Sequence, residues 1–582
     1  MTEQRAEEML HGVGVSRGKA QGKLLVYTPA ELHVSDKAAA DTEKETVRFL
    51  DCVAAVRSRI LKKTEQCADA RDALYREILD AHLEILEDSD SLLEPVKELI
   101  RTENRNASAA INEKMEEIAG VFDALEDEYL RQRAADIRDL KVQLLCELAK
   151  EKTAALSELT EPVIVAARDL SPSDTISMDR EMVIGIVCEA GGKTSHTSVL
   201  ANAMGIPAVM GCTGLLAQVC GKSFVQIDGD AGTVTLDPNE AQIERFAGKI
   251  AADRDREERL RGFVGAPTYS KDGRQCLIYA NIAAPEESRT ACESGCEGIG
   301  LFRSEFLYYA DKNTPPSEET QRKAYVQALR FAKGRLVIVR TLDAGGDKPV
   351  PALNMPQESN PFLGRRAIRL CLEERAVFRT QLRALLRAAN DGPLQIMLPM
   401  ISGLQELRAA KEEVALARDS LRSEGLTVPE KIPVGIMIEV PSAVMMADEL
   451  AQEADFFSIG TNDLTQYTLA ADRGNEYVSA LYSHYDPAVV RMIAHAVRAA
   501  HRHGIHCGMC GEAAGDMLYA PLLLGLGLDE FSVAPRSVAA LREEISRLDC
   551  TECEALAGRI LLLSTKDEIV TELRQFAQTN MR

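Results

Sequence analysis

The sequence predicts a multidomain α/β protein, in which a β/α domain carries an inserted helical domain and is followed by a C-terminal TIM (β/α)8 barrel. The chain has 582 residues, enough for several separate cores. Strand-like runs occur on both sides of a long helical segment near the N-terminus, which predicts the insertion. Beyond residue 262, strand-like and helical runs alternate eight times, which is typical of a (β/α)8 barrel.

The composition is that of an ordinary globular protein, with 46% hydrophobic and 27% charged residues. The formal net charge of −22 argues against nucleic acid or an anionic membrane surface as the main partner, and it favours a basic protein partner. The N-terminus has no apolar signal segment, and the chain has no run of about 18 apolar residues. These features predict a cytoplasmic protein without membrane insertion.

The N-terminal half changes its pattern twice. Residues 8–28 predict two short strands with glycine turns, and residues 30–150 are amphipathic, helical and rich in acidic side chains. Strand-like segments return at 162–166, and a later charged helical run lacks a core pattern. We therefore predict a β/α domain from residues 1–29 and 152–238, a helical domain over 30–151, a linker helix over 239–261 and the barrel over 262–582.

A histidine lies at a predicted helix start within the β/α domain. An apolar strand over residues 182–187 is followed by two glycines, and Thr194 or Ser195 could cap a helix that places His196 in its first turn. Free backbone N–H groups at a helix start favour an anion, and imidazole is a good nucleophile. A Walker A loop is excluded because it needs a glycine at the position of Val187. From these residues alone, a half-buried histidine bonded to a neighbour stays the alternative to a phosphoryl acceptor.

The second half of the chain supplies eight strand-like segments. They span residues 276–283, 298–305, 335–343, 394–400, 433–440, 456–463, 505–512 and 530–535. In a TIM barrel the reacting groups gather at the C-terminal ends of the strands. The ends of these segments therefore predict where the chemistry lies.

The predicted strand ends carry charged and polar side chains. They are Asn281, Arg303, Glu305, Arg340, Asp343, Glu439, Asn462, Asp463, Cys510 and Glu512, and Arg366 and Arg473 lie in the loops that follow. Arginine forks bind phosphate and carboxylate oxygens. Glu439 and Asp463 suit Mg²⁺, which takes few protein ligands. The set predicts a small, multiply charged anion held partly through Mg²⁺; the alternative is that each arginine only pairs with a neighbouring acid at the barrel rim.

Two cysteine pairs have C-x-x-C spacing, Cys507 with Cys510 and Cys550 with Cys553, and raise the alternative of a zinc site. The first pair lies at the end of a predicted strand, where alternate side chains point apart. The second pair has no third ligand nearby in the sequence. The fourteen cysteines therefore predict reduced thiols.

Several motifs carry a resemblance to a known family. The stretch GGKTSHTS over residues 191–198 resembles the phosphohistidine loop shared by enzyme I of the sugar phosphotransferase system, pyruvate phosphate dikinase and phosphoenolpyruvate synthase, with Lys193 where the family usually has arginine. The barrel segments over 300–307, 339–343, 360–367, 457–467 and 508–512 resemble enzyme I, the phosphoenolpyruvate–protein phosphotransferase. The helical insert, with DEYL at 127–130 and RAAD at 133–136, resembles its carrier-docking domain.

This resemblance implies a role for each matched residue. His196 would accept the phosphoryl group, with Thr175 hydrogen-bonded to its ring, and Cys510 would protonate the enolate carbon. Glu439 and Asp463 would bind Mg²⁺. The residues expected to hold phosphoenolpyruvate are Arg303, Arg340, Arg366, Asn462, Asp463 and Arg473. Arg365 replaces a common aromatic residue, which leaves open whether Arg365 or Arg366 faces the ligand.

The resemblance also implies partners and an overall reaction. The phosphoryl group would pass from phosphoenolpyruvate to His196 and then to a histidine of the carrier protein HPr, with Mg²⁺ as cofactor. The phosphohistidine domain would swivel on the linker helix, and the barrel would form a homodimer. The alternatives are a dikinase-like relative that also uses ATP, for which the chain offers no further domain, and a catalytically silent regulatory relative.

Overall fold

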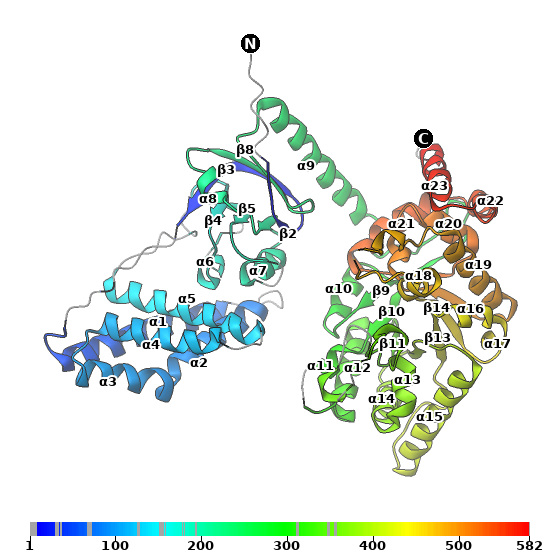
Figure 1. The fold of residues 1–582 in the computed structure, drawn as a ribbon, viewed down its shortest axis with the longest axis horizontal. Helices are drawn as coiled ribbons and strands as arrows, with labels where there is room; N and C mark the ends of the chain where they lie inside the picture. Colours follow the sequence, from blue (N-terminus) through cyan, green and yellow to red (C-terminus); the bar gives the residue numbers. More distant parts are fainter. Residues whose placement is uncertain are drawn as a thin grey trace. The chain divides into compact units, whose positions relative to one another are not determined.

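A computed structural model describes most of the chain: residues 9–28, 34, 38–66, 73–124, 128–150, 156, 159–176, 178–179, 181–192, 195–309, 313–345, 350–353, 355, 358–475 and 477–580. The chain forms two compact units, Met1–Asp255 and Arg256–Arg582 (Figure 1). Within the described residues, no helix combines the length and the apolarity that crossing a membrane requires.

The first unit contains one eight-stranded sheet in the order β1-β8-β7-β3-β4-β5-β6-β2. Its strands are β1 Met9–His11, β2 Val13–Ser16, β3 Lys19–Tyr27, β4 Val163–Ala167, β5 Val183–Cys188, β6 Ala208–Met210, β7 Phe224–Asp228 and β8 Thr233–Leu236. Strand β3 pairs in parallel with β4, although more than a hundred residues separate them. This pairing confirms that the helical segment is inserted into a β/α domain.

The N-terminal strands differ from the prediction, because three strands form where two were expected. Gly12 lies between β1 and β2, and Gly18, between β2 and β3, has a φ of +103° that favours glycine. A Cβ atom at Gly12 would lie 2.5 Å from the carbonyl oxygen of Met210. The close approach of the Gly12 backbone to Met210 lies at the break between β1 and β2. Strand β1 has only three residues, which is too short to show a strand pattern in the sequence.

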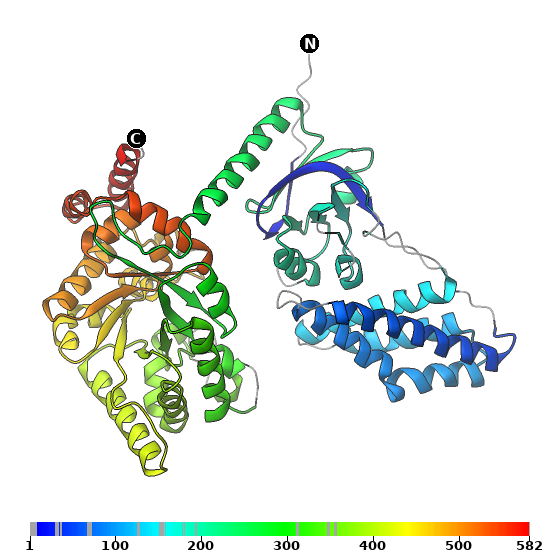
Figure 2. The same cartoon turned by 180° about the vertical axis from the view of Figure 1, so that it is seen from behind.

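The insert is a helical bundle with its own apolar core (Figure 2). Its helices are α1 Thr42–Gln66, α2 Ala73–Glu87, the π-helix η2 Ser89–Leu93, α3 Glu94–Thr102, α4 Ala107–Asp123 and α5 Glu128–Ala149. Phe49, Val56, Ile100 and Leu144 are fully or almost fully buried in that core. Short helices α6 Pro172–Ile176, α7 His196–Met204 and α8 Leu215–Gln218 pack on the sheet domain. Helix α9 Glu240–Arg261 contains no buried residue, as expected for a helix without a core pattern.

The second unit is a closed parallel barrel in the order β10-β11-β12-β13-β14-β15-β16-β9, which confirms the predicted TIM barrel. All eight predicted strands form, as β9 Leu277–Ile282, β10 Gly298–Arg303, β11 Leu336–Arg340, β12 Leu394–Leu398, β13 Val434–Ile438, β14 Phe456–Ile459, β15 His506–Met509 and β16 Glu530–Val533. Pairing of β16 with β9 closes the ring. The strands are shorter than the predicted segments, because the polar ends of those segments lie in the loops that follow the strands.

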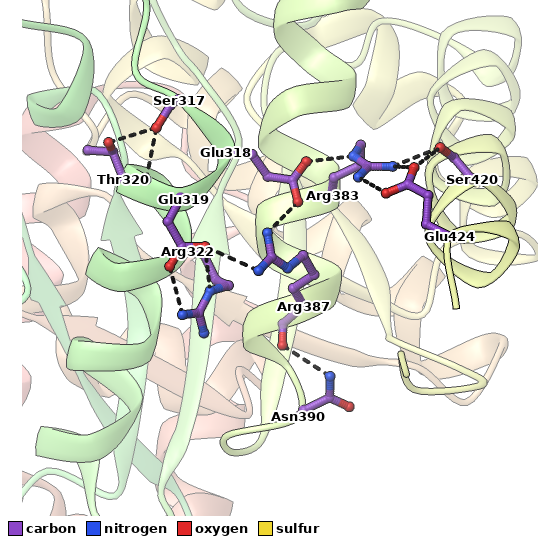
Figure 3. A network of polar contacts seen from close by, with 10 residues as sticks. All are labelled: Ser317, Glu318, Glu319, Thr320, Arg322, Arg383, Arg387, Asn390, Ser420 and Glu424. Carbon is purple, nitrogen blue, oxygen red and sulfur yellow. Dashed lines mark hydrogen bonds and ion pairs between the residues drawn. The ribbon is translucent and has the colours of Figure 1, made fainter. Parts of the chain in front are cut away.

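Helices surround the barrel (Figure 1). They are α10 Glu287–Glu293, α11 Phe306–Tyr309, α12 Glu318–Ala332, α13 Ala367–Glu373, α14 Arg375–Ala388, α15 Leu404–Ser423, α16 Pro441–Met445, α17 Ala447–Ala451, α18 Thr461–Leu469, α19 Pro487–Arg502, α20 Ala520–Leu526, α21 Val538–Arg547, α22 Cys550–Ile560 and α23 Lys566–Asn580. On the outside, Arg383 of α14 bridges Glu318 of α12 and Glu424, the residue that caps the C-terminus of α15 (Figure 3). The ion pairs join α12, α14 and the C-terminal end of α15 on the outer side of the barrel.

Candidate active site

A cavity of about 390 Å³ lies at the C-terminal end of the barrel strands. Every barrel residue that the resemblance marked as binding or catalytic lines it: Arg303, Arg340, Arg366, Glu439, Asn462, Asp463, Arg473 and Cys510. These residues come from five strand ends and the loops after them, so the barrel topology alone brings them together. Leu301, Phe306, Phe362 and Met437 add an apolar wall that the sequence did not indicate.

Of the two adjacent arginines, Arg366 faces the cavity and Arg365 does not. Arg366 is 6% exposed, and its Nη2 donates to Asp343 at 2.9 Å and to Asp463 at 3.2 Å. Arg365 instead pairs on the outside with Glu373 and Glu374. Gly345, with a φ of +114°, lets its backbone pack against Arg366, because a Cβ there would lie 2.4 Å from the Cβ of Arg366.

The second buried arginine, Arg340, is held by two acids. Its Nη2 lies 3.1 Å from Glu305 Oε1 and its Nη1 lies 2.9 Å from Asp343 Oδ2. Burial by itself would raise the pKa of Asp343, but Arg340 and Arg366 lower it below its usual value. The alternative of rim arginines that pair with acids therefore describes part of the arrangement.

The two buried guanidiniums still have unused donors. The Nε atoms of Arg340 and Arg366 are buried and have no hydrogen-bond partner among the described residues. Arg303 and Arg473 lie exposed at the rim of the same cavity. An anion that enters would therefore meet two fixed guanidiniums below and two exposed ones above.

Two carboxylates lie among these arginines. Glu439 is 2% exposed and its Oε1 accepts a 2.6 Å hydrogen bond from the backbone N–H of Met400. Burial, with Asp463 and Asp343 nearby, raises the pKa of Glu439 well above its usual value. Oδ1 of Asp463 is buried with no hydrogen-bond partner in the described part of the chain. A buried carboxylate pair with an unused oxygen fits a hard divalent cation, which would supply the missing positive charge.

The sequence predicted that Asn462 and Asp463 lie at the end of a strand. They lie instead in the first turn of α18. Strand β14 ends at Ile459, and position 460 after it favours glycine because a Cβ there would lie 2.8 Å from Glu439 Oε2. Asn462 donates from Nδ2 to Glu512 at 3.2 Å and accepts from the N–H of Glu512 at 3.1 Å. The helix start, not the strand, therefore aims these two residues into the cavity.

Cys510 follows β15 and is 4% exposed. Its N–H donates to the carbonyl oxygen of Ile459 at 3.1 Å, and its own carbonyl oxygen accepts from Asn281 Nδ2 at 3.1 Å. Burial raises the pKa of the Cys510 thiol to about 11. The thiol is therefore protonated near neutral pH, as a proton donor must be. Cys507 lies inside β15, fully buried and outside the lining of this cavity.

In the other unit, α7 begins at His196 as the sequence predicted. Ser195 is the N-cap, and its Oγ accepts from the N–H of Ser198 at 3.3 Å. The side chain of His196, with Lys193 and Thr194, lies outside the described residues, and so does its predicted contact with Thr175. Thr175 is buried, and its hydroxyl donates to the carbonyl oxygen of Ser171 at 3.0 Å.

One residue that holds Arg366 in place was missed at the sequence level. The hydroxyl of Tyr467 accepts a 3.0 Å hydrogen bond from Arg366 Nη1 and donates to the carbonyl oxygen of Phe362 at 2.5 Å. Tyr467 lies four residues after Asp463 on α18, so both share one helix face. The spacing could have shown this, but the strand assigned to residues 456–463 concealed the helical period.

Comparison with known proteins shows which protein family the chain resembles. Family models of PEP-utilising enzymes match in three places: the N-terminal domain at residues 11–133, the mobile domain at 159–232 and the PEP-binding domain at 257–550. A solved structure titled Enzyme I (nEIt), determined by NMR, is 36% identical, with 42% of this chain and 99% of that chain covered and a TM-score of 0.37.

The curated relatives are similar over almost the whole chain. The phosphoenolpyruvate-protein phosphotransferase of Bacillus subtilis (strain 168) is 42% identical over 566 residues, which cover 97% of this chain and 99% of the relative. The protein of the same name from Geobacillus stearothermophilus is 41% identical over 569 residues, with 98% of each chain covered. The matched regions therefore extend over nearly the full length of both relatives. The chain therefore belongs to the phosphoenolpyruvate-protein phosphotransferase family, the enzyme I family.

Proposed function

We propose that the protein transfers the phosphoryl group of phosphoenolpyruvate to His196 and then to a histidine of the carrier protein HPr, as the first step of sugar phosphotransfer. The observation that carries the proposal is the single cavity in which four arginines, two buried carboxylates and a protonated thiol meet. Phosphoenolpyruvate presents a phosphate, a carboxylate and a carbon that must gain a proton, so each group has a matching partner in the set.

Binding of the substrate rests on the arginines. Arg340 and Arg366 are fixed by Asp343, while their buried Nε groups are unused, and Arg303 and Arg473 approach from the rim. Forks of this kind bind phosphate and carboxylate oxygens with defined geometry. Preorganised positive charge also stabilises the transferring phosphoryl group, whose transition state spreads charge over three oxygens.

Glu439 and Asp463 would hold the Mg²⁺ cofactor. When bound, the cation neutralises phosphate charge and favours the in-line transfer. Both carboxylates stay in place without it, because Met400 holds Glu439 and Arg366 holds Asp463. Asn462 is positioned beside them by Glu512 and would bind a substrate oxygen.

Loss of the phosphoryl group leaves the enolate of pyruvate, which needs a proton on carbon. We assign this proton to Cys510: its S–H bond breaks as the new C–H bond forms, and the thiolate then recovers a proton from solvent. Because the pKa of Cys510 is raised to about 11, its thiolate is a stronger base than an ordinary cysteine thiolate and regains a proton readily.

His196 would receive the phosphoryl group at the start of α7, where free N–H groups stabilise the phosphate. Because the substrate cavity lies within the second unit and His196 within the first, the transfer requires the mobile domain to swivel on α9.

We propose the acidic helical insert as the surface that docks HPr, and a homodimer formed by the barrel as the working form in the cytoplasm. Sedimentation with Mg²⁺ and phosphoenolpyruvate present tests the dimer, and a monomer at tens of micromolar chain contradicts it.

The function is tested by incubating the full chain with phosphoenolpyruvate labelled in its phosphate, with and without Mg²⁺. We expect Mg²⁺-dependent label on the protein that is lost in acid and stable in base, and its transfer to added HPr. His196→Gln should fold normally and take up no label. Label at the wild-type level on that variant, or label that never moves to HPr, would contradict the proposal.

A further inference from the structure

A ring of three hydrogen bonds joins the helical insert to the β/α domain. Helix α5 of the insert packs against α6 of the β/α domain (Figure 1). Between these helices, the hydroxyl of Ser173 donates to Asp139 Oδ2 at 2.5 Å and accepts from Gln143 Nε2 at 2.6 Å. Gln143 Nε2 also donates to Asp139 Oδ2 at 3.2 Å, because the two residues lie one turn apart on α5. Each of the three side chains is therefore bonded to the other two.

On the side of the insert, the acceptor of the ring is buried. Asp139 is 5% exposed, and His82 of α2, which is 1% exposed, lies beside it with Nε2 3.8 Å from Asp139 Oδ2. A hydrogen bond to a carboxylate is stronger than one between neutral groups, and exclusion of water strengthens it further. The ring therefore ties Ser173 to a buried part of the insert and not to a side chain at its surface.

On the side of the β/α domain, the segment that carries Ser173 is held by contacts of its own. The N–H of Ser171 donates to Asp174 Oδ2 at 3.1 Å, and the N–H of Asp174 donates back to Ser171 Oγ at 3.1 Å. The hydroxyl of Tyr27, on β3, donates to Asp174 Oδ1 at 2.6 Å. These bonds close the first turn of α6 as a capping box and fasten it to the sheet. Ser173 consequently has a fixed place relative to the sheet.

The same segment supports the helix on which His196 lies. Thr197, the residue after His196, is 1% exposed, and its hydroxyl donates to the carbonyl oxygen of Leu170 at 3.0 Å. Leu170 lies just before α6, and α6 also packs against α7. A continuous set of short contacts therefore leads from Asp139 of the insert, through Ser173, to the start of α7.

We propose that Ser173 is a positioning residue for phosphoryl exchange with the carrier protein, because it fixes the insert relative to the start of α7. The inference rests on the proposed function, in which the insert docks HPr and His196 carries the phosphoryl group. Transfer between two histidines needs the phosphorus roughly in line between the two ring nitrogens, and a misplacement of about 1 Å can cost about 100-fold in rate. A carrier held on the insert meets this condition only while the insert keeps its orientation to α7.

The two phosphoryl transfers should respond differently when this contact is lost. Every residue that lines the substrate cavity lies in the second unit, so transfer from phosphoenolpyruvate to His196 does not use the insert. Ser173→Ala removes the one hydroxyl by which the β/α domain takes part in the ring. The insert is then held less firmly, and exchange with HPr should slow while labelling by phosphoenolpyruvate continues.

The test uses the full chain, which is first labelled with phosphoenolpyruvate carrying a labelled phosphate and then mixed with increasing HPr in a rapid-quench experiment. For Ser173→Ala we expect the rate constant of transfer at saturating HPr to fall at least about tenfold. The HPr concentration that gives half the maximal rate and the rate of labelling should stay close to wild type. Ser173→Thr keeps a hydroxyl and should restore most of the transfer rate. Ser270→Ala is the matched control, because it removes a 2.6 Å bond from a buried serine to Asp272 within the barrel.

Gln143→Ala opens the same ring from the side of the insert. It should slow the same transfer step, and adding it to Ser173→Ala should slow that variant little further, because both changes break one ring. Transfer to HPr by Ser173→Ala as fast as by Ser270→Ala would overturn the inference and leave the proposed function intact. Equal losses of labelling and transfer would also overturn it, and so would a raised half-maximal HPr concentration with an unchanged rate at saturation. A wild-type chain that passes no label to HPr would refute the proposed function and this inference with it.

Discussion

Arg366 donates a 3.2 Å hydrogen bond from Nη2 to Oδ2 of Asp463, and both side chains are buried at the mouth of the barrel. Asp463 is thereby oriented by the same guanidinium that faces the substrate cavity. Its second oxygen has no partner among the described residues. One contact therefore connects the groups that would bind the anion with the groups that would bind the cation.

Replacing Arg366 by lysine should lower kcat/KM for phosphoenolpyruvate at least about 100-fold, because a buried, forked ion pair is broken while the charge is kept. Arg365→Lys is the matched control, since its guanidinium pairs with Glu373 and Glu374 on the outside. It should keep nearly normal kinetics. Steady-state pyruvate formation measures both variants, and equal losses in the two would show that the structure assigns the wrong arginine.

Cys510→Ala should slow turnover of phosphoenolpyruvate by about 10²–10⁴-fold, the usual effect of removing a general acid. Cys507→Ala removes a buried thiol two residues inside the same strand end and should retain the wild-type rate. Phosphoryl exchange between His196 and HPr involves no carbon protonation and should survive in both. If Cys507→Ala were as slow as Cys510→Ala, or if zinc were lost from either variant, the proton-donor role would be wrong.

The pH profile of pyruvate formation follows from the buried thiol. A proton donor works only while protonated, so the rate falls as the pH rises through its pKa. Burial raises the pKa of Cys510 from its usual value near 9 to about 11, which moves that fall above the neutral range. Between about pH 7 and pH 10 the wild type should show no decline that Cys510→Ser lacks. A falling limb near pH 9 present only in the wild type would contradict the buried, protonated thiol.

Glu439→Gln should raise the Mg²⁺ concentration needed for half-maximal binding by more than about tenfold, because a charged oxygen ligand becomes a neutral amide. Titration calorimetry of Mg²⁺ in the presence of phosphoenolpyruvate, with His196→Gln added to both chains, measures this binding without phosphoryl transfer. Glu530→Gln is the control, since Glu530 is equally buried in the barrel but does not line the cavity. Equal weakening in both would place the cation elsewhere.

Arg383→Met should destabilise the barrel by about 1–2 kcal/mol without changing the kinetics, since it removes contacts between three helices (Figure 3). Arg383 donates to Glu318 at 2.6 Å and to Glu424 at 2.7 Å through both Nη atoms. Arg330, which is 74% exposed and lies 3.8 Å from Asp391, is the control and should matter little. Urea unfolding followed by circular dichroism suits a chain without tryptophan, and high salt should shrink the effect.

The sequence by itself determined the elements and the positions of most reactive groups. The barrel strands were predictable because each is a short apolar run bounded by turns, and the ends of those runs carry Arg303, Arg340, Glu439 and Cys510. The start of α7 at His196 was predictable because its signals, two glycines and a capping serine, are local. The roles of these residues came from motif resemblance, and for the individual side chains they stay predictions.

Tertiary structure alone decided which groups meet and what their surroundings do to them. Arg365 and Arg366 are chemically identical neighbours, and their directions differ because Arg366 packs against Gly345 and pairs with Asp343, whereas Arg365 pairs with Glu373 and Glu374. The pKa values of Cys510 and Glu439 depend on burial, and segments that are distant in the sequence create that burial. Local pattern fixes secondary structure, whereas direction, burial and proximity arise only when remote segments pack.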